Sequence, residues 1–275
     1  MTGADTAQVV LRLDRITKRF GALTANDAVS LNLHRGEVVA LLGENGAGKT
    51  TLMNILFGQY TADEGQVMVM GQALPPGNPR AALEAGVGMV HQHFTLADNL
   101  TVLENVTLGT EPLWRWRSER AAARTKIARL SADFHLAVDP DARVGSLTVG
   151  ERQRVEILKA LYREARILIL DEPTAVLTPQ ETDDLFATLR EAVAKGLSIV
   201  FISHKLHEVM DIAHRVVILR HGKVVAEMAT TDTDRHALAA AMVGSTVSAP
   251  RVAPGVPGKA LMHLEAVGTP DRGSA

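Results

Sequence analysis

The sequence predicts an α/β fold with a largely parallel core sheet, an N-terminal antiparallel β subdomain and a helical subdomain. Continuous apolar runs of strand length occur at residues 38–42, 87–90, 167–170, 198–202 and 216–219. Runs of this kind are typical of strands buried on both faces, and helical apolar spacing separates several of them. Residues 8–13 and 29–33 carry alternating or clustered apolar side chains instead, which predicts antiparallel strands at the start of the chain.

The composition narrows the classes of function. The chain has 275 residues, is 46% hydrophobic and 22% charged, and carries a net charge of −2. This charge offers no bulk attraction for nucleic acid, so no nucleic-acid partner is expected. The chain contains no cysteine, which excludes disulfides, thiolate metal sites and cysteine nucleophiles. Neither a signal peptide nor a membrane-spanning run of apolar residues is recognised, so a cytoplasmic location is expected.

Residues 43–50 fit the pattern Gly-x-x-x-x-Gly-Lys-Thr between a predicted buried strand and a predicted helix. Glycines permit positive φ and let backbone N–H groups close around phosphate oxygens, and the helix N-terminus adds partial positive charge. We expect Lys49 to reach the β- and γ-phosphates of a nucleotide and the Thr50 hydroxyl to bind Mg²⁺. The residues expected to contact the nucleotide here are Gly43, Glu44, Asn45, Gly46, Ala47, Gly48, Lys49, Thr50 and Thr51.

The strand predicted at residues 167–170 ends in two adjacent carboxylates, Asp171 and Glu172. Ligands of α/β folds lie at the carboxyl ends of strands. We expect Asp171 to bind Mg²⁺ and Glu172 to orient or deprotonate the water that attacks the γ-phosphate. The alternative is that the two acids cap a following helix.

Taken in order, the motifs resemble those of the ATP-binding domain of ABC transporters, over about residues 8–244. The ordered set consists of the loop 43–50, Gln92, Leu147-Thr148-Val149-Gly150-Glu151, Asp171-Glu172 and His204. Phosphate loops occur in many families, whereas this ordered set is specific. The resemblance implies a P-loop ATPase of the ABC type, with the helical subdomain at about residues 95–155 and with ATP and Mg²⁺ as cofactors.

The resemblance also assigns roles to single residues. Phe20 would stack on adenine, with a place in the hydrophobic core as its alternative. Gln92 would contact Mg²⁺ or the attacking water, and His204 would contact the γ-phosphate and position Glu172. With Lys49, these three residues form the expected catalytic set: Glu172, His204, Gln92 and Lys49. The expected metal ligands are Thr50, Gln92 and Asp171.

The segment Leu147, Thr148, Val149, Gly150 and Glu151 corresponds to the family's signature loop, which acts in trans on the nucleotide of a facing ATPase domain. The common family form is Leu-Ser-Gly-Gly-Gln, so Val149 adds bulk and Glu151 adds charge near a phosphate. Thr178 stands where the loop after the two acids usually has Asp. These departures raise the question of whether the opposite site is active and whether the two sites communicate.

Both departures resemble the first half of the tandem ATPases of sugar and nucleoside importers. Residues 245–259 are rich in Pro and Gly, which is typical of a linker. Residues 260–267 echo the apolar positions of residues 9–16, which predicts that residues 260–275 begin a truncated second ABC domain.

The function implied is ATP hydrolysis that energises an importer of nucleosides or simple sugars, by a peripheral protein at the cytoplasmic face of the membrane. Transmembrane permease subunits, a second ABC domain and, indirectly, an extracytoplasmic substrate-binding protein are the implied partners. A regulatory half with weak hydrolysis and a soluble non-transport ABC ATPase are the alternatives. The string at residues 90–94 resembles the nucleoside branch.

A basic run in the predicted helical subdomain has two interpretations. Its members are Arg115, Arg117, Arg120, Arg124, Lys126 and Arg129, with Trp114 and Trp116 beside them. The run is either a solvated helix face or a contact with the membrane partner or anionic lipid.

Overall fold

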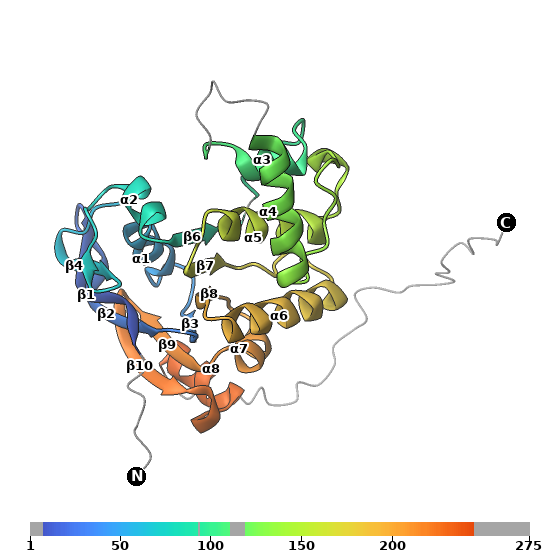
Figure 1. Ribbon diagram of the computed structural model, residues 1–275. Helices are drawn as coiled ribbons and strands as arrows, with labels where there is room; N and C mark the ends of the chain where they lie inside the picture. Colours follow the sequence, from blue (N-terminus) through green and yellow to red (C-terminus); the bar gives the residue numbers. More distant parts are fainter. Residues whose placement is uncertain (1–7, 93, 111–118, 245–275) are drawn as a thin grey trace, which may run out of the picture. The chain divides into compact units, whose positions relative to one another are not determined.

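The computed structural model describes residues 8–92, 94–110 and 119–244 (Figure 1). The chain divides into two units, Met1–Ser245 and Thr246–Ala275. The second unit lies wholly outside the described residues, and so do the predicted linker and the predicted start of a second domain. Within the part that is described, no helix combines the length and the apolar character needed to cross a bilayer.

The N-terminal strands form an antiparallel sheet, as the sequence predicts. Its four strands have the order β2-β1-β4-β5. Their bounds are β1 Val9–Phe20, β2 Leu23–His34, β4 Glu64–Val69 and β5 Gln72–Ala73. The first two strands are longer than the predicted segments because they continue past the apolar residues to the turn that joins them. The strands β4 and β5, which lie on the other side of β1, were not predicted from the sequence.

The core sheet contains six strands in the order β10-β9-β3-β8-β7-β6. The bounds are β3 Val38–Leu42, β6 Val87–Val90, β7 Ile167–Asp171, β8 Ser198–Ile202, β9 Arg215–Arg220 and β10 Lys223–Ala229. The five strands predicted from apolar runs are present and pair in parallel. The edge strand β10 pairs antiparallel with β9 and was missed because its residues are half exposed and not continuously apolar.

Eight helices lie in the described residues, and six of them contribute residues to the hydrophobic cluster on one face of the core sheet. Their bounds are α1 Lys49–Leu56, α2 Pro79–Glu84, α3 Val102–Thr107, α4 Glu119–Asp133, α5 Val149–Tyr162, α6 Pro179–Ala194, α7 Leu206–Ile212 and α8 Arg235–Val243. Single 3₁₀ turns occur at Val144–Ser146 and Thr230–Asp232. The region predicted to be helical contains α3 and α4, and both pack on α5.

The two faces of the core sheet bury alternate residues of the same strands. Val38, Ala40 and Leu42 of β3 pack with residues of α3 to α8. Val39 and Leu41 pack instead with α1 and with the antiparallel sheet. This period of two explains why the core strands are apolar without interruption, since neither face meets water.

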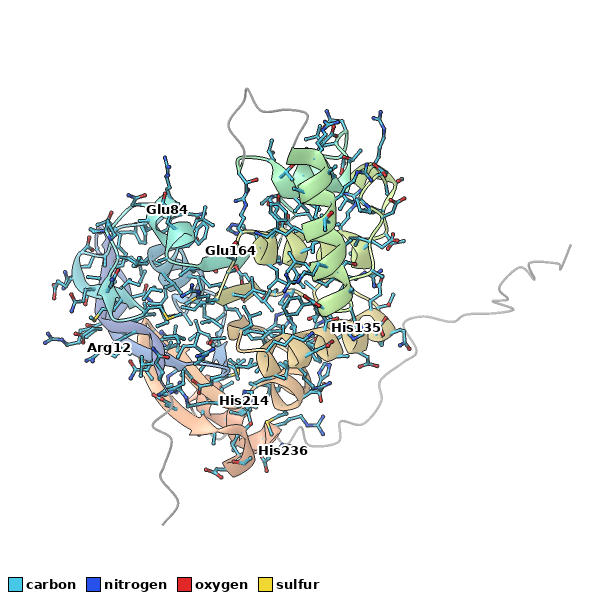
Figure 2. The ribbon with its side chains drawn as sticks, viewed as in Figure 1. Arg12, Glu84, His135, Glu164, His214 and His236 are labelled. Carbon is cyan, nitrogen blue, oxygen red and sulfur yellow. The ribbon has the colours of Figure 1, made fainter. Side chains whose placement is uncertain are left out.

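Carboxylates pair with the described members of the basic run. Arg120 lies 3.2 Å from Glu104, and Arg124 pairs with Asp141. Lys126 lies 3.0 Å from Glu164, which is labelled in Figure 2. These side chains are paired within the chain and remain largely exposed, so both a solvated face and a partner contact are compatible with this part of the run. Arg115, Arg117, Trp114 and Trp116 lie outside the described residues.

The close packing of the sheet centre can be tested at Phe201. This residue is fully buried in β8, and its ring makes an edge contact with Phe186 of α6 at 5.9 Å between centroids. Phe201→Ala should lower the free energy of unfolding by about 3 to 5 kcal/mol because a cavity remains. Val225→Ala on β10, where the side chain is exposed, should change it by less than about 0.5 kcal/mol. Urea denaturation measures both, and equal losses would contradict this view of the core.

Candidate functional site

A cleft of about 920 Å³ opens at the carboxyl ends of β3, β7 and β8. Parallel pairing places these three strand ends side by side, so the loops that follow them meet at one edge of the sheet. The residues lining the cleft are Phe20, Leu23, Ala25, Gly43 to Thr51, Gln92, Asp171, Glu172, His204 and Met242. The structure therefore brings together every residue that was expected to contact the nucleotide within this chain.

Glycines of the loop occupy backbone conformations that other residues rarely adopt. Gly43, Gly46 and Gly48 have φ of +152°, +82° and +99°. A Cβ on Gly48 would collide with the carbonyl oxygen of Ala25, and one on Gly43 with that of Leu219. The loop then enters α1, whose first turn has no acidic residue and no side-chain cap among the described residues. Its N–H groups are thus suited to an anion at the bottom of the cleft.

The loop is supported from below by residues that the sequence analysis missed. Asn26 of β2 is fully buried, and its side-chain amide donates a hydrogen bond to the Gly48 carbonyl at 3.1 Å. Gly222, in the turn between β9 and β10, donates from its N–H to the Ala47 carbonyl at 3.2 Å. The sequence contains no signal for these contacts because Asn26 and Gly222 meet the loop only in the folded chain.

The Lys49 side chain is 9% exposed and lies against the rim of the loop. Its Nζ donates hydrogen bonds to the carbonyls of Gly43 at 2.7 Å and Glu44 at 3.0 Å. Burial lowers the pKa of Lys49, while the charges of Glu172 and Asp171 act in the opposite sense. The two hydrogen bonds hold the Lys49 ammonium in the cleft, where it interacts with the charges of Asp171 and Glu172. From this position it could neutralise phosphate charge.

The two residues expected to activate water lie in contact. His204 Nδ1 is 3.0 Å from Glu172 Oε1, a distance that allows a hydrogen bond. The Glu172 N–H donates to the Ile202 carbonyl at 2.9 Å, which joins the end of β7 to the end of β8. Glu172 has φ of +47°, an uncommon conformation for a residue with a side chain. Such backbone strain persists only where the surrounding contacts hold it.

Asp171 is half-buried beside Glu172 and Lys49. Burial and the neighbouring charge of Glu172 raise the pKa of Asp171, and the charges of His91 and Lys49 oppose this. Asp171, Thr50 and Gln92 all line the cleft and offer oxygen ligands, which suit a hard cation such as Mg²⁺. The described residues contain no group of three or more His, Cys, Asp or Glu that could hold a metal. The oxygen donors of Thr50, Gln92 and Asp171 fit an Mg²⁺ ion whose other ligands would be water and phosphate.

One exposed aromatic side chain, that of Phe20, lines the cleft. Phe20 is 45% exposed at the end of β1, so it does not belong to the core. Its ring makes an edge contact with Tyr60 at 5.8 Å between centroids, and Lys18 Nζ lies 5.4 Å from the ring centroid. Met242 of α8 lines the cleft as well. No sequence motif placed α8 or Tyr60 near this site.

The signature loop lies outside the cleft and begins α5. Thr148 is the N-cap residue, and its hydroxyl accepts a hydrogen bond from the Glu151 N–H at 3.3 Å. Glu151 Oε2 in turn accepts from the Thr148 N–H at 2.8 Å and lies 2.9 Å from the hydroxyl. The bond from the Thr148 N–H holds the pKa of Glu151 below its usual value. Glu151 therefore serves as the second member of a capping box.

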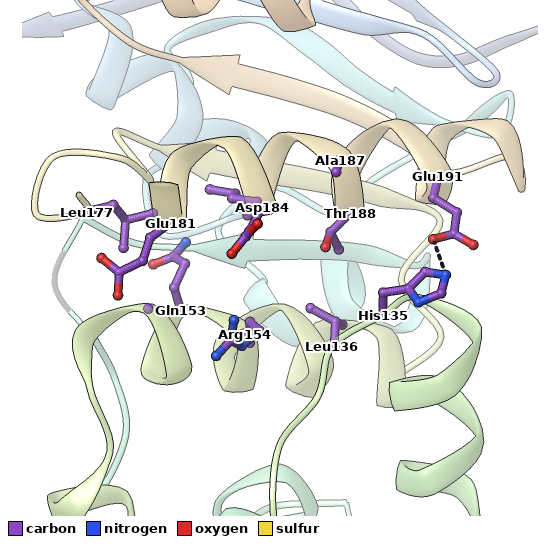
Figure 3. Close-up of a pocket in the computed structure, with 12 residues that line it drawn as sticks. His135, Leu136, Gln153, Arg154, Leu177, Glu181, Asp184, Ala187, Thr188 and Glu191 are labelled. Carbon is purple, nitrogen blue, oxygen red and sulfur yellow. Dashed lines mark ion pairs between the residues drawn. The ribbon is translucent and has the colours of Figure 1, made fainter. Parts of the chain in front are cut away.

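A second capping box ties this loop to the turn after the two acids. Thr178 is the N-cap residue of α6, and Glu181 accepts a bond from its N–H at 2.9 Å. Glu181 also accepts a bond from the Gly150 N–H, and a Cβ on Gly150 would collide with this carboxylate. Figure 3 shows Gln153 pointing from α5 toward α6, in the pocket where Glu181 lies. Local capping thus explains the hydroxyl at position 178 and the glycine at position 150.

The fold and the cleft define a P-loop nucleotide-binding domain with an additional helical region. The model of the ABC transporter family matches residues 26–175, which is more than half of the chain. The chain therefore belongs to the ABC transporter family, as the order of its motifs predicted.

Several relatives are named for import. The chain is 47% identical over 241 residues to the nucleoside import ATP-binding protein NupA of Lactococcus lactis, covering 88% of this chain and 48% of that protein. It is 43% identical over 300 residues to the glucose import ATP-binding protein TsgD13 of Haloferax volcanii, covering 98% and 54%. The chain thus spans about half the length of the curated relatives it matches.

Solved structures of the family have the same fold. The ADP conformation of MJ1267, an ATP-binding cassette of an ABC transporter, superposes with a TM-score of 0.76 at 28% identity. That match covers 86% of this chain and 99% of MJ1267. The dimeric post-hydrolysis state of MJ0796, bound to ADP and Pi, gives a TM-score of 0.68 at 25% identity, covering 80% and 98%.

The raised pKa of Asp171 has a consequence for stability. The folded chain holds a proton on this carboxyl more tightly than the unfolded chain, so ionisation as pH rises through the native pKa costs stability. We expect Asp171→Asn to raise the melting temperature of the nucleotide-free protein at neutral pH. The gain should shrink as pH falls below the native pKa. Asp183→Asn, at an exposed position of α6, should have little effect at either pH; a lower melting temperature for Asp171→Asn at neutral pH would contradict the prediction.

The contact between Gly150 and Glu181 predicts that Gly150→Ala changes the free energy of unfolding in opposite directions in the presence and in the absence of the Glu181 side chain. Gly150→Ala should lower the free energy of unfolding, because the new Cβ displaces the Glu181 carboxylate and breaks bonds together worth about 1 to 2 kcal/mol. In a Glu181→Ala background the same substitution should stabilise by up to about 1 kcal/mol, since alanine favours the helix. Urea denaturation of the four proteins measures this; an identical effect of Gly150→Ala in both backgrounds would show that the contact has no energetic weight.

Proposed function

We propose that this chain is the ATP-binding and hydrolysing unit of an importer for nucleosides or simple sugars. The arrangement of the Lys49 loop, Asp171 and the Glu172–His204 pair in one cleft carries the proposal. Relatives named for nucleoside and glucose import support the substrate class. Family membership implies ATP binding.

Nucleotide binding follows from the shape and charge of the cleft. The loop N–H groups and the N-terminus of α1 surround the β- and γ-phosphates, and Lys49 neutralises part of their charge. The exposed ring of Phe20 offers a face on which adenine can stack. Bound Mg²⁺ would screen the phosphate charge, and Thr50, Asp171 and Gln92 would hold it.

Hydrolysis is assigned to the end of β7. Glu172 orients a water molecule and accepts its proton while the water oxygen attacks the γ-phosphorus and ADP leaves. His204 holds the Glu172 carboxylate through its Nδ1 and faces the cleft where the γ-phosphate would lie. The presence of this pair at contact distance favours active hydrolysis over a regulatory half with weak hydrolysis.

The contact with the permease is proposed for a surface away from the nucleotide cleft. A second cleft, of about 840 Å³, lies between α2, α4 and the end of α5, and we place the permease contact there. Glu84 and Glu164, both labelled in Figure 2, line it together with Arg80 and Lys126. In this proposal the protein is peripheral at the cytoplasmic face of the membrane, and the extracytoplasmic substrate-binding protein acts through the permease.

A second ABC domain completes the proposed assembly. The signature loop Leu147–Glu151 lies outside the cleft of its own chain, which fits a role at the nucleotide of a facing domain. The relatives are about twice as long as the matched region, and MJ0796 has been solved as a dimer. The string at residues 90–94 favours the nucleoside branch for the transported substrate.

Replacement of Glu172 tests the proposal. Glu172→Gln in the full-length protein should lower steady-state ATP turnover by about 10²-fold or more, because the amide cannot accept a proton. The affinity for ATP should stay within a few-fold, since the loop 43–50 is unchanged. Glu191→Gln on α6, where Glu191 pairs with His135 at 3.2 Å, is the matched control and should hydrolyse ATP normally. Phosphate release measures the turnover, and a nucleotide-binding assay measures the affinity for ATP. Unchanged turnover in Glu172→Gln would refute the role of this residue as base.

A further inference from the structure

A buried carboxylate connects the two loops that carry Glu172 and His204. Glu208 lies on α7 and is 2% exposed, although α7 otherwise buries apolar residues at Val209 and Ile212. A buried carboxylate is costly unless hydrogen bonds and an opposite charge compensate it. The residues that bind the Glu208 carboxylate therefore indicate which part of the structure it stabilises.

Both oxygens of Glu208 are used. Oε2 accepts hydrogen bonds from the Thr174 hydroxyl at 2.7 Å and from the Ser203 hydroxyl at 3.0 Å. Oε1 lies 3.0 Å from Lys205 Nζ. Thr174 and Ser203 are 1% and 2% exposed, so these bonds are shielded from water. The partners stand two residues after Glu172 and on either side of His204.

Lys205 closes the network. Its Nζ donates to the Thr174 carbonyl at 3.0 Å, and its N–H donates to the Ser203 hydroxyl at 3.0 Å. The turn after β7 and the turn after β8 are therefore joined twice, once through the Glu208 carboxylate and once through the Lys205 ammonium. The pair Glu172–His204 spans the same two turns at the surface of the cleft.

The backbone conformation of Glu172 explains why the turn after β7 requires the bonds to Glu208 and Lys205. Its φ of +47° is unfavourable for glutamate, so the turn would relax if contacts beyond it did not fix its course. The hydrogen bond from its N–H to Ile202 fixes one side of the turn, and the bonds to Thr174 fix the other. A relaxed turn would move the Glu172 carboxylate away from His204.

We propose that Glu208 is a positioning residue for hydrolysis, which holds Glu172 and His204 in contact through Thr174 and Ser203. This inference rests on the function proposed above for Glu172. Glu208 lies beneath the cleft lining and is assigned no contact with the nucleotide. Its loss is therefore expected to lower the rate of the chemical step while binding of ATP is retained.

The test uses turnover and ATP affinity of the full-length protein. Glu208→Ala and Thr174→Val should each lower kcat about 10²-fold, the effect of a displacement near 1 Å, with ATP affinity changed less than about 3-fold. Thr174→Ser keeps the hydroxyl and should restore kcat to near the wild-type value. The combined Glu208→Ala, Thr174→Val protein should be no slower than the slower single variant, because both substitutions break one connection.

Glu37→Gln is the matched control for the loss of a partly buried ion pair. Glu37 pairs with Arg215 at 2.8 Å at the start of β3, the end of that strand opposite the cleft. It should lose thermal stability but keep kcat. The inference would be overturned by a normal kcat in Glu208→Ala, or by an equal decrease in kcat in Thr174→Ser and Thr174→Val. It would also be overturned if the decreases in kcat of the two single variants multiplied in the double variant. If Glu172→Gln itself retained normal turnover, the proposed function would fail instead.

Discussion

The parallel pairing of β3, β8 and β7 is the constraint on which the site depends. It places the carboxyl ends of three strands at one edge, and each end delivers a different group: the phosphate loop, His204 and the two carboxylates. The buried sheet supplies the rigidity, and the Glu172 N–H joins two of the strand ends directly through the Ile202 carbonyl.

Two charged groups in the cleft where function is proposed have pKa values shifted by burial. Asp171 has a raised pKa because it is half-buried beside Glu172, and burial lowers the pKa of Lys49 in the same cleft. A site that collects these charges is suited to a ligand that brings both phosphate anions and a divalent cation. The buried carboxylate of Glu208, by contrast, is fully paired, which is the expected difference between a group that binds a ligand and one that holds a loop.

The signature region shows how local capping can explain departures from a family pattern. Glu151 and Glu181 each complete a capping box, with Thr148 and Thr178 as the N-cap residues. Glu181 also takes a bond from the Gly150 N–H, so α5 and α6 share one carboxylate at their N-termini. The segment expected to face a neighbouring domain and the turn that follows Glu172 are therefore in direct contact within one chain.

The sequence by itself determined the five buried strands, the phosphate loop, the acidic pair and the order of motifs that indicates the family, because these are local patterns of apolar residues, glycines and charges. It could not find β10, Asn26, Tyr60 or Met242 as parts of the fold and site, since their roles arise from neighbours distant along the chain. The sequence did not distinguish a core position for Phe20 from a place in the cleft, because the exposure of its side chain is a property of the folded chain. Only the tertiary structure decided that Glu208 joins the turns of Glu172 and His204, because that contact depends on how α7 packs beneath two strand ends.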